Sequence, residues 1–350
     1  MATAIVLLCD SNFLVATVGT ALAARRHTAD PAVGIFVYVL DRDDRDLQRL
    51  RQVLLPRGVD LSAVNIAELG VVKSSDFNKT HVPIATMARL WIDDLLPPDY
   101  DKFLYLDGDL EIVGKLDSLL ATPVPHRGFL AAPDLPLLIK GDWGRSARET
   151  DAYLDNLGVS DADDYFNAGV LLVDRMGWAD LAAEALAYFM RFPERCRYHD
   201  QSALNATAKA KRGRLSLVWN YQTDFVAVAD PRRWGISPAI WHFTGFPKPW
   251  HADVFPWSNG FGGSFALGAA AFVEAQLAIP PLPEAQGIAA GIAERQKVKF
   301  RLRWVYPWRR FIRAQRIRAE LGNVRAVAQR GPLASFGALQ GYGRPRAVAK

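Results

Sequence analysis

The chain has 350 residues, half of them hydrophobic, so it is long enough to bury a core in one large domain or in two. Its two cysteines, Cys9 and Cys196, lie far apart and outside any CxxC pair, which excludes a disulfide framework and a zinc–cysteine site and fits a reducing compartment. The first apolar run, residues 4–9, is too short for a signal sequence, and no apolar stretch approaches the roughly 18 residues of a membrane span.

The net charge of +5 is unevenly distributed along the chain. Residues 295–318 contain ten Lys or Arg and no acid, and residues 319–350 add a net charge of +4, which leaves a net charge of −9 on residues 1–294. The sequence therefore combines an acidic body with a basic carboxyl-terminal tail.

Apolar runs alternate with helix-length amphipathic stretches from the amino terminus onward. The runs at 4–9, 33–40 and 62–69 predict strands, and the stretches at 13–26 and 45–55 predict helices. This alternation is typical of βαβ units and predicts an α/β fold with a mostly parallel sheet flanked by helices.

A predicted helix at 81–96 leads to a predicted strand at 102–106, which ends on two carboxylates. Asp107 and Asp109 lie at i and i+2, so an extended backbone points both side chains to one side, and Gly108 between them lets a ligand approach closely. Open α/β sheets bind ligands at this end of a strand, and two carboxylates this close favour a cation between them. The alternative is a solvated turn, because so short a motif also occurs by chance.

The next predicted elements are a strand at 168–174, helices at 178–190 and 199–211, and a strand at 238–243. From about Gly260 the pattern loosens into a helix at 265–279 and a proline-rich linker. We predict a single α/β domain over 1–260, a helix and linker region over 261–294, and a tail over 295–350 that packs only loosely on the domain.

Asp10, Asn12 and Phe13 follow the first predicted strand. Two polar side chains there could read the edge of a base, and an aromatic ring could stack on it. The alternative is a helix cap at Asp10 or Asn12 with Phe13 in the core.

Small and polar residues also lie at the start of two later elements. Asn167, Ala168 and Gly169 begin a strand and are small and polar enough for a sugar to lie against, although an ordinary turn is the alternative. Asp200 and Gln201 begin a helix, where capping is the usual explanation.

His242, Gly245 and Lys248 accompany the last predicted strand. A lone histidine after a strand is more often structural than a metal ligand. An imidazole beside a glycine and a lysine, however, suits a site for a metal and a phosphate.

Taken together, in this order and spacing, these stretches resemble the family 8 retaining glycosyltransferases, which include glycogenin and bacterial lipooligosaccharide galactosyltransferases. The resemblance covers roughly residues 4–255 and is closest to the bacterial branch. It implies the GT-A type of nucleotide-sugar-binding fold, in which two Rossmann-like units abut around a mostly parallel sheet, and it makes 1–260 the catalytic domain.

The resemblance also implies a metal and a donor. Asp107, Asp109 and His242 would hold Mn²⁺, with Mg²⁺ as the alternative, and the ion would bridge the diphosphate of a UDP-sugar. The other positions implied around the donor are Asp10, Asn12 and Phe13 for the uracil, Asp134, Asn167, Asp200 and Gln201 near the sugar, Gly245 and Lys248 for the phosphates, and Arg89, Gly108, Ala168 and Gly169 as further residues that touch the donor.

Breaking a sugar–phosphate bond builds positive charge on the anomeric carbon and negative charge on the diphosphate, which a divalent cation and Lys248 would stabilise. Retention through a covalent intermediate needs a carboxylate nucleophile. The corresponding position here is Gln201, an amide, so we favour attack on the same face, with the leaving phosphate accepting the acceptor's proton and Gln201 stabilising the cationic centre. Asp200 remains the alternative.

The predicted function is metal-dependent, retaining transfer of galactose or glucose from UDP-galactose or UDP-glucose to a glycan, such as the core of lipopolysaccharide. One alternative is a haloacid-dehalogenase-like phosphatase, in which an Asp-x-Asp motif usually ends the first strand of the core. The other is a non-catalytic protein that binds a sugar nucleotide or, through its tail, a nucleic acid.

The tail interleaves aromatic and basic residues. Trp and Tyr prefer the headgroup region of membranes, and after Pro307 the residues Trp308, Phe311 and Ile312 follow the i, i+3, i+4 spacing of an interfacial helix. We predict that 295–318 attach the protein peripherally to the anionic inner face of the membrane, with the body in the cytoplasm and a lipid-linked acceptor. The acidic body disfavours nucleic acid, and a solvated basic extension is the alternative.

Overall fold

The structure is a computed structural model that describes residues 2–40, 42, 44–65, 87–140, 144–208, 211–223, 228–252, 261–281 and 284–328. Within these residues a central sheet has the strand order β3-β2-β1-β4-β7-β6-β8, and a small sheet has the order β5-β10-β9. The strands are β1 (Ala2–Cys9), β2 (Gly34–Leu40), β3 (Asp60–Val64), β4 (Tyr100–Leu106), β5 (Leu110–Ile112), β6 (Phe129–Pro133), β7 (Phe166–Asp174), β8 (Arg212–Arg214), β9 (Tyr221–Gln222) and β10 (Ile240–His242).

Every strand of the central sheet except β7 runs in the same direction. β1 pairs in parallel with β2 and β4, β2 with β3, and β6 with β8, whereas β7 is antiparallel to β4 and β6. The mostly parallel sheet predicted from the sequence is therefore confirmed. The reversal of β7 places its first residues beside the carboxyl end of β4, where Leu106 pairs with Val170.

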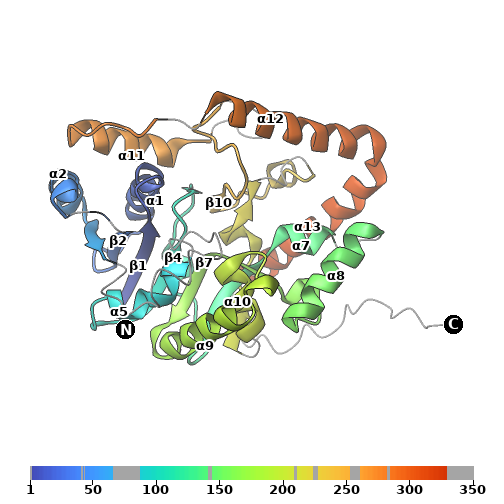
Figure 1. Ribbon diagram of the computed structural model, residues 1–350, viewed down its shortest axis with the longest axis horizontal. Helices are drawn as coiled ribbons and strands as arrows, with labels where there is room; N and C mark the ends of the chain where they lie inside the picture. The colour runs from blue at the N-terminus through green and yellow to red at the C-terminus, as the bar shows by residue number, and fades with distance from the viewer. Residues whose placement is uncertain are drawn as a thin grey trace.

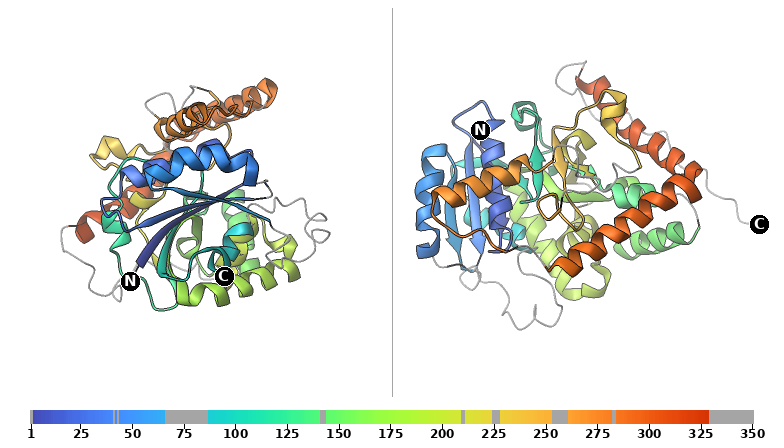
Figure 2. Two further views of the ribbon diagram at one scale, coloured as in Figure 1. Left: turned by 90° about the vertical axis from the view of Figure 1, so that its left-hand side faces the viewer. Right: turned by 90° about the horizontal axis from the view of Figure 1, so that it is seen from above.

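Helices cover both faces of the central sheet (Figure 2). Ile5 and Leu7 of β1 pack in a core shared with α1, α2 and α11, and the alternate residues Val6 and Leu8 pack on the other face with α5, α9 and α10. Because both faces are buried, β1 is apolar along most of its length. The longer helices are α1 (Leu14–Arg26), α2 (Asp44–Leu54), α8 (Arg145–Leu157), α9 (Trp178–Arg191), α10 (His199–Thr207), α11 (Gly263–Glu274), α12 (Ala285–Phe300) and α13 (Pro307–Ala328), and the shorter ones include α5 (Ile92–Leu95), α6 (Asp117–Leu120) and α7 (Leu135–Lys140).

Three predicted elements differ from the structure. Of the helix predicted at 81–96, the structure describes residues 87–96, in which a 3-10 turn at Ala88–Trp91 follows helical Met87 and precedes α5, and residues 81–86 lie outside the described residues. The strand predicted at 62–69 begins two residues earlier as β3, and its residues 66–69 also lie outside the described part. The helix predicted at 199–211 ends at Thr207.

The helix α11 belongs to the core of the body. It crosses α1 so closely that a Cβ on Gly19 would lie 2.0 Å from the carbonyl oxygen of Ser264, and a Cβ on Gly268 would lie 1.9 Å from that of Val15. Only glycine at both positions permits this crossing, and it buries Phe272 of α11 in the core of the sheet.

The two helices after α11 form an arm that leaves the body and returns to it (Figure 1). The structure describes α12 in full and buries none of its residues, and the chain then turns at a one-turn π-helix, Arg301–Val305, into α13. Ile317 and Leu321 of α13 are fully buried in the main core, so the loose packing predicted for the tail is wrong for this helix. The apolar i, i+4 pair on one face of α13 is the physical reason.

None of the helices within the described residues is long and apolar enough to cross a membrane.

Candidate functional site

The carboxylate pair lies where the sequence predicts it, at the carboxyl end of β4. The backbone N–H of Asp107 donates to the carbonyl of Gly169 at 2.9 Å, which fixes this end of β4 against the start of β7. Asp109 immediately precedes β5, and its carbonyl accepts the N–H of Phe243 at 3.0 Å. The two carboxylates therefore stand at the junction between the two sheets.

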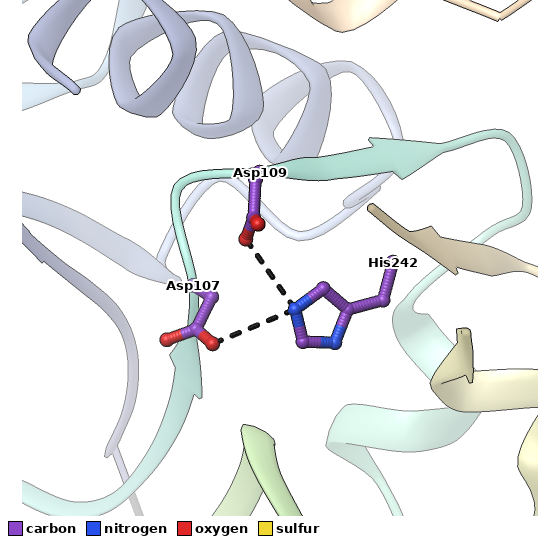
Figure 3. A group of neighbouring side chains, drawn as sticks. All are labelled: Asp107, Asp109 and His242. Atoms are coloured by element: carbon purple, nitrogen blue, oxygen red, sulfur yellow. Dashed lines mark ion pairs between the residues drawn. The ribbon is translucent and has the colours of Figure 1, made fainter. Parts of the chain in front are cut away.

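The small sheet brings His242 to the carboxylates. β10 pairs antiparallel with β5, and His242 is the register partner of Leu110, the residue after Asp109. Its Nε2 lies 3.4 Å from Oδ1 of Asp109 and 3.6 Å from Oδ2 of Asp107 (Figure 3). Each of the three residues offers one ligand atom within 4.8 Å of the other two, so the predicted trio converges.

The other oxygen of each carboxylate is already engaged. Oδ1 of Asp107 accepts the hydroxyl of Tyr105 at 2.6 Å and lies 3.2 Å from Nη2 of Arg89. Oδ2 of Asp109 accepts from Nζ of Lys248 at 2.7 Å. Asp107 and Asp109 thus each turn their remaining oxygen toward Nε2 of His242, as two ligands of a common ion would.

A backbone N–H fixes which nitrogen of His242 carries a proton. The N–H of Gly169 donates to Oδ1 of Asn167 at 3.0 Å, which orients that amide. Oδ1 of Asn167 also accepts from Nδ2 of Asn220 at 2.9 Å, so Oδ1 of Asn220 faces Nδ1 of His242, again at 2.9 Å. An amide oxygen only accepts, so Nδ1–H is the donor, and Nε2 points its lone pair at the carboxylates.

These groups fit a hard divalent cation. Two carboxylate oxygens and one imidazole nitrogen suit Mn²⁺, and an octahedral ion with bonds of about 2.1 Å separates neighbouring ligands by about 3 Å, close to the observed spacing. The hydrogen bond from His242 to Asn220 is the support that metal-bound imidazoles normally have.

Electrostatics keep Asp109 ionised. Burial alone would raise the pKa of its carboxyl, but the ammonium of Lys248 opposes burial, and the pKa lies well below its usual range. Because an ionised carboxylate is the form that binds a cation, Asp109 is ready to act as a ligand.

Arg89 links the pair to Asp200. Its Nη1 donates to the carbonyl of Ala168 at 2.5 Å, and its Nε lies 2.7 Å from Oδ2 of Asp200. Burial would lower the pKa of Arg89, but Asp107 and Asp200 outweigh burial and raise it. Burial raises the pKa of Asp200 to about 6, with Arg89 opposing the rise.

Three of the predicted sugar-side residues form one hydrogen-bonded network with Ala168. Oδ2 of Asp134 accepts from Nδ2 of Asn167 and from Nε2 of Gln201, both at 3.2 Å. Oε1 of Gln201 accepts the N–H of Ala168 at 3.0 Å, so both ends of this amide are oriented. The structure thus brings these four residues together, whereas their contact with a sugar remains a prediction.

Phe13 is 40% exposed, so the core position that the sequence left open for it is wrong. The side chain of Asp10 accepts the N–H groups of Asn12 and Phe13 at 2.9 and 3.1 Å, which forms the turn before α1. Nζ of Lys248 lies 5.8 Å from the centre of the Phe13 ring, so this exposed ring borders the metal site.

The reason given for Gly108 is corrected by the structure. A Cβ there would lie 2.1 Å from Oγ1 of Thr17, so the glycine makes room for α1 and not for a ligand. Gly169 is the glycine that the metal site requires, because a Cβ there would lie 2.3 Å from Cε1 of His242 and 2.7 Å from Oδ2 of Asp107. Its missing side chain lets these two residues approach each other over the backbone of β7. Gly245 lies in the loop after β10 and is partly exposed.

Sequence reasoning missed two residues of the site. Tyr105 holds Asp107, and Asn220 fixes the tautomer of His242. In the sequence Tyr105 is an ordinary residue of an apolar strand. Asn220 precedes β9, a strand of two residues, and has no periodic pattern around it. A buried amide is recognised only after the strands that enclose it are placed.

Comparison with known proteins supports the family that the sequence resembles. A family model described as glycosyl transferase family 8 matches residues 4–254. General stress protein A of Bacillus subtilis (strain 168) is 26% identical over 242 residues, which cover 62% of this chain and 77% of that protein. Lipopolysaccharide 1,2-glucosyltransferase of Escherichia coli (strain K12) is 29% identical over 174 residues, which cover 47% of this chain and 48% of that protein.

A crystal structure of the galactosyltransferase LgtC in complex with donor and acceptor sugar analogues superimposes with a TM-score of 0.59 at 23% identity. The superposition covers 79% of this chain and 97% of that one, and it shows that the fold is the predicted GT-A type. The family match spans β1 to the loop after β10 and includes both sheets and every predicted site residue. The chain belongs to glycosyl transferase family 8.

Proposed function

We propose that the protein transfers a hexose, galactose or glucose, from a UDP-sugar to a glycan with retention of configuration and with Mn²⁺ as the preferred cofactor. The observation that carries the proposal is the convergence of Asp107, Asp109 and His242, with Nε2 of the imidazole facing one oxygen of each carboxylate. Exposed Phe13, next to this centre, supports a stacking position for the uracil.

Two basic residues of the chain would assist the departure of the diphosphate in different ways. A divalent ion held by Asp107, Asp109 and His242 would supply positive charge to the leaving diphosphate. Lys248, held at Asp109, adds a second positive charge on the same side. Arg89 orients Asp107 by its ion pair and so aims the other oxygen of that carboxylate at the metal site.

The surroundings of the two rival residues favour Gln201 at the anomeric carbon. Hydrogen bonds with Ala168 and Asp134 hold both ends of its amide, so the position of the amide oxygen is fixed. Asp200 is 3% exposed, and its Oδ2 faces Arg89. That oxygen has no hydrogen-bond partner among the described residues, yet the adjacent guanidinium makes it a positioning group for Arg89 more than a nucleophile. These features support same-face attack.

The acceptor that we propose is a bacterial cell-surface glycan, such as the lipopolysaccharide core. The support is the similarity to the lipopolysaccharide 1,2-glucosyltransferase of Escherichia coli. Family membership contradicts the phosphatase alternative, and the position of Asp107 after the fourth strand of the chain agrees with this correction. A non-catalytic binder is the outcome that the next experiment tests.

The purified full chain is expected to release UDP from only one or two of UDP-galactose, UDP-glucose and their N-acetyl forms. Release should need Mn²⁺, stop with chelator and resume with added Mn²⁺, because Asp107 and Asp109 cannot hold the diphosphate without a cation. Coupled measurement of UDP, with NMR assignment of the product anomer, checks donor and stereochemistry. Binding of UDP without any turnover would indicate a non-catalytic binder, and turnover unaffected by chelator would contradict the metal site.

We also propose that the arm attaches the protein to the cytoplasmic face of a membrane. The elbow, defined as residues 300–312, joins α12 to α13 at one end of the molecule (Figure 1). Its exposed apolar side chains belong to Phe300, Trp304, Val305, Tyr306, Trp308, Phe311 and Ile312. Basic residues alternate with them, and each Lys or Arg near an anionic surface contributes about 1 kcal/mol. The division of the chain at 260 and 294 is kept here as a proposal about function alone, because α11 and α13 both contribute side chains to the core of the body.

Replacing Trp304 and Phe311, each 64% exposed, with Ser is expected to weaken binding to phosphatidylglycerol vesicles about tenfold in co-sedimentation. Met176→Ser is the matched control, because Met176 is 65% exposed and precedes α9, outside the arm. Binding should also weaken with salt. Equal binding of the double variant and of Met176→Ser would contradict membrane attachment and would indicate that the arm is only a solvated extension. Point variants are needed, because a truncation before 295 removes core residues of α13.

A further inference from the structure

The helix α12 lies on the loop that follows β10. Nε of Arg295 donates to the carbonyl of Phe246 at 2.9 Å, and Nη2 lies 3.4 Å from the carbonyl of Pro247, to which it donates. One turn earlier, Gly291 faces the same loop, where a Cβ would lie 2.9 Å from Cδ of Pro247 and 3.1 Å from Cδ1 of Phe246. Residues 291 and 295 are four apart, so a single face of α12 makes these contacts.

The loop that α12 contacts ends on Lys248, which enters the metal site. Nζ of Lys248 donates to Oδ2 of Asp109 at 2.7 Å and to the carbonyl of Phe243, and the residue is only 9% exposed. Its backbone N–H donates to Nδ1 of His251 at 3.2 Å. The same short segment therefore contacts α12 through its carbonyls and the metal site through its side chain.

We propose that α12 positions Lys248 for the donor diphosphate, so that the carboxyl-terminal arm forms part of the donor site. The identity of the ligand rests on the function proposed above. Gly291 provides the close approach, and Arg295 is a positioning residue that acts through two carbonyls of the loop. The donor residues predicted from the sequence end at Lys248 and include none from the arm. The sequence of the arm shows only its basic and aromatic composition, which does not indicate a contact with the donor site.

Two glycines of α12 provide a matched test. Gly291→Ala adds a methyl group against Pro247, whereas Gly287→Ala, one turn earlier, adds it to open space. Both changes replace glycine with alanine, the better helix former. Isothermal titration of the full chain with UDP in saturating Mn²⁺ is expected to give an about tenfold higher Kd for Gly291→Ala and an unchanged Kd for Gly287→Ala. An unchanged Kd for Gly291→Ala, or equal shifts in both, would overturn the proposal.

Hydrogen exchange separates this inference from the donor assignment. Backbone amides of residues 243–246 and of Lys248 are expected to exchange faster in Gly291→Ala than in Gly287→Ala when no ligand is added. If the unchanged protein does not bind UDP, the proposed donor is wrong, and the exchange rates still decide whether α12 holds the loop. Equal exchange in the two variants would overturn the positioning role.

Arg295 provides a second test that does not depend on steric clash. Arg295→Ala should raise the KM for the donor several-fold, and Arg295→Lys should recover part of the loss through one of the two carbonyls. Lys297→Ala is the control for charge, because Lys297 is exposed and pairs only within α12, with Glu294 at 3.7 Å among the described residues.

A double-mutant cycle with Lys248→Ala tests whether Arg295 acts through the lysine. The effect of Arg295→Ala on KM is expected to disappear once Lys248 is absent, because the loop then has no side chain to place. Full additivity of the two changes would show that Arg295 contributes only general stability, and the proposal would fail. Thermal midpoints of all variants, measured in the same buffer, identify any loss that comes from unfolding.

Discussion

Replacing Asp107 with Asn is expected to lower kcat/KM for the UDP-sugar about a thousandfold, because it removes one metal ligand without disturbing the fold. The amide oxygen can keep the hydrogen bond from Tyr105 and the contact with Arg89. Its NH₂ group then replaces Oδ2, 3.6 Å from Nε2 of His242, and turns its N–H toward the place of the ion. One change thus removes a ligand oxygen and puts a donor hydrogen in its place.

Thermal unfolding with and without Mn²⁺ measures the loss of the metal independently of turnover. The unchanged protein should gain stability from the ion, since a ligand that binds only the folded state raises the midpoint, and Asp107→Asn should gain nothing. In chelator the two midpoints should agree closely. Asp180→Asn is the control, because this carboxylate is 63% exposed and pairs with Arg127 away from the site. A normal response of Asp107→Asn to Mn²⁺ would contradict the assignment of the ligand.

The elements that sequence predicts well are those long enough to show a period. β1, α1 and β2 each have seven or more residues with continuous or alternating apolar character, and the structure places all three within a residue or two of their predicted bounds. In the small sheet the strand predicted at 238–243 is confirmed as the shorter β10, whereas β5 and β9, with three and two residues, escape prediction. So few residues show no period, and they are held by pairing between distant segments.

The site shows the same division between local and distant information. Asp107 and Asp109 are visible as a local motif after a strand. His242 is marked in the sequence by its glycine and lysine neighbours, but only the resemblance to a family joins it to the carboxylates, because its approach to Asp109 depends on the pairing of β5 with β10. The contacts of Arg295 with the loop before Lys248 depend on where α12 lies, which its sequence does not indicate.

Asn220 is the strongest example of a residue that only the structure identifies, and it leads to the second large effect. It is fully buried and joins Oδ1 of Asn167 to Nδ1 of His242. Asn220→Leu is expected to weaken Mn²⁺ binding by about tenfold to a hundredfold, the usual consequence of losing the group that orients a ligating imidazole. The ring does not have to rotate for this loss, because without the acceptor the neutral imidazole can move its proton to Nε2, where the proton blocks the metal.

The measurement that isolates this effect is Mn²⁺ binding, by titration calorimetry, compared with stability in chelator. Asn220→Leu should also cost about 1–3 kcal/mol of folding free energy, because a buried donor and acceptor lose their partner. Asn205→Leu is the matched control: Asn205 is also buried, but it bonds the backbone of Phe166 and of Gln201 and does not contact His242. Both variants should lose similar stability, and only Asn220→Leu should lose affinity for Mn²⁺. Similar affinity in the two would mean that the proton position on His242 does not depend on Asn220, and that the chain of amides from Gly169 serves packing alone.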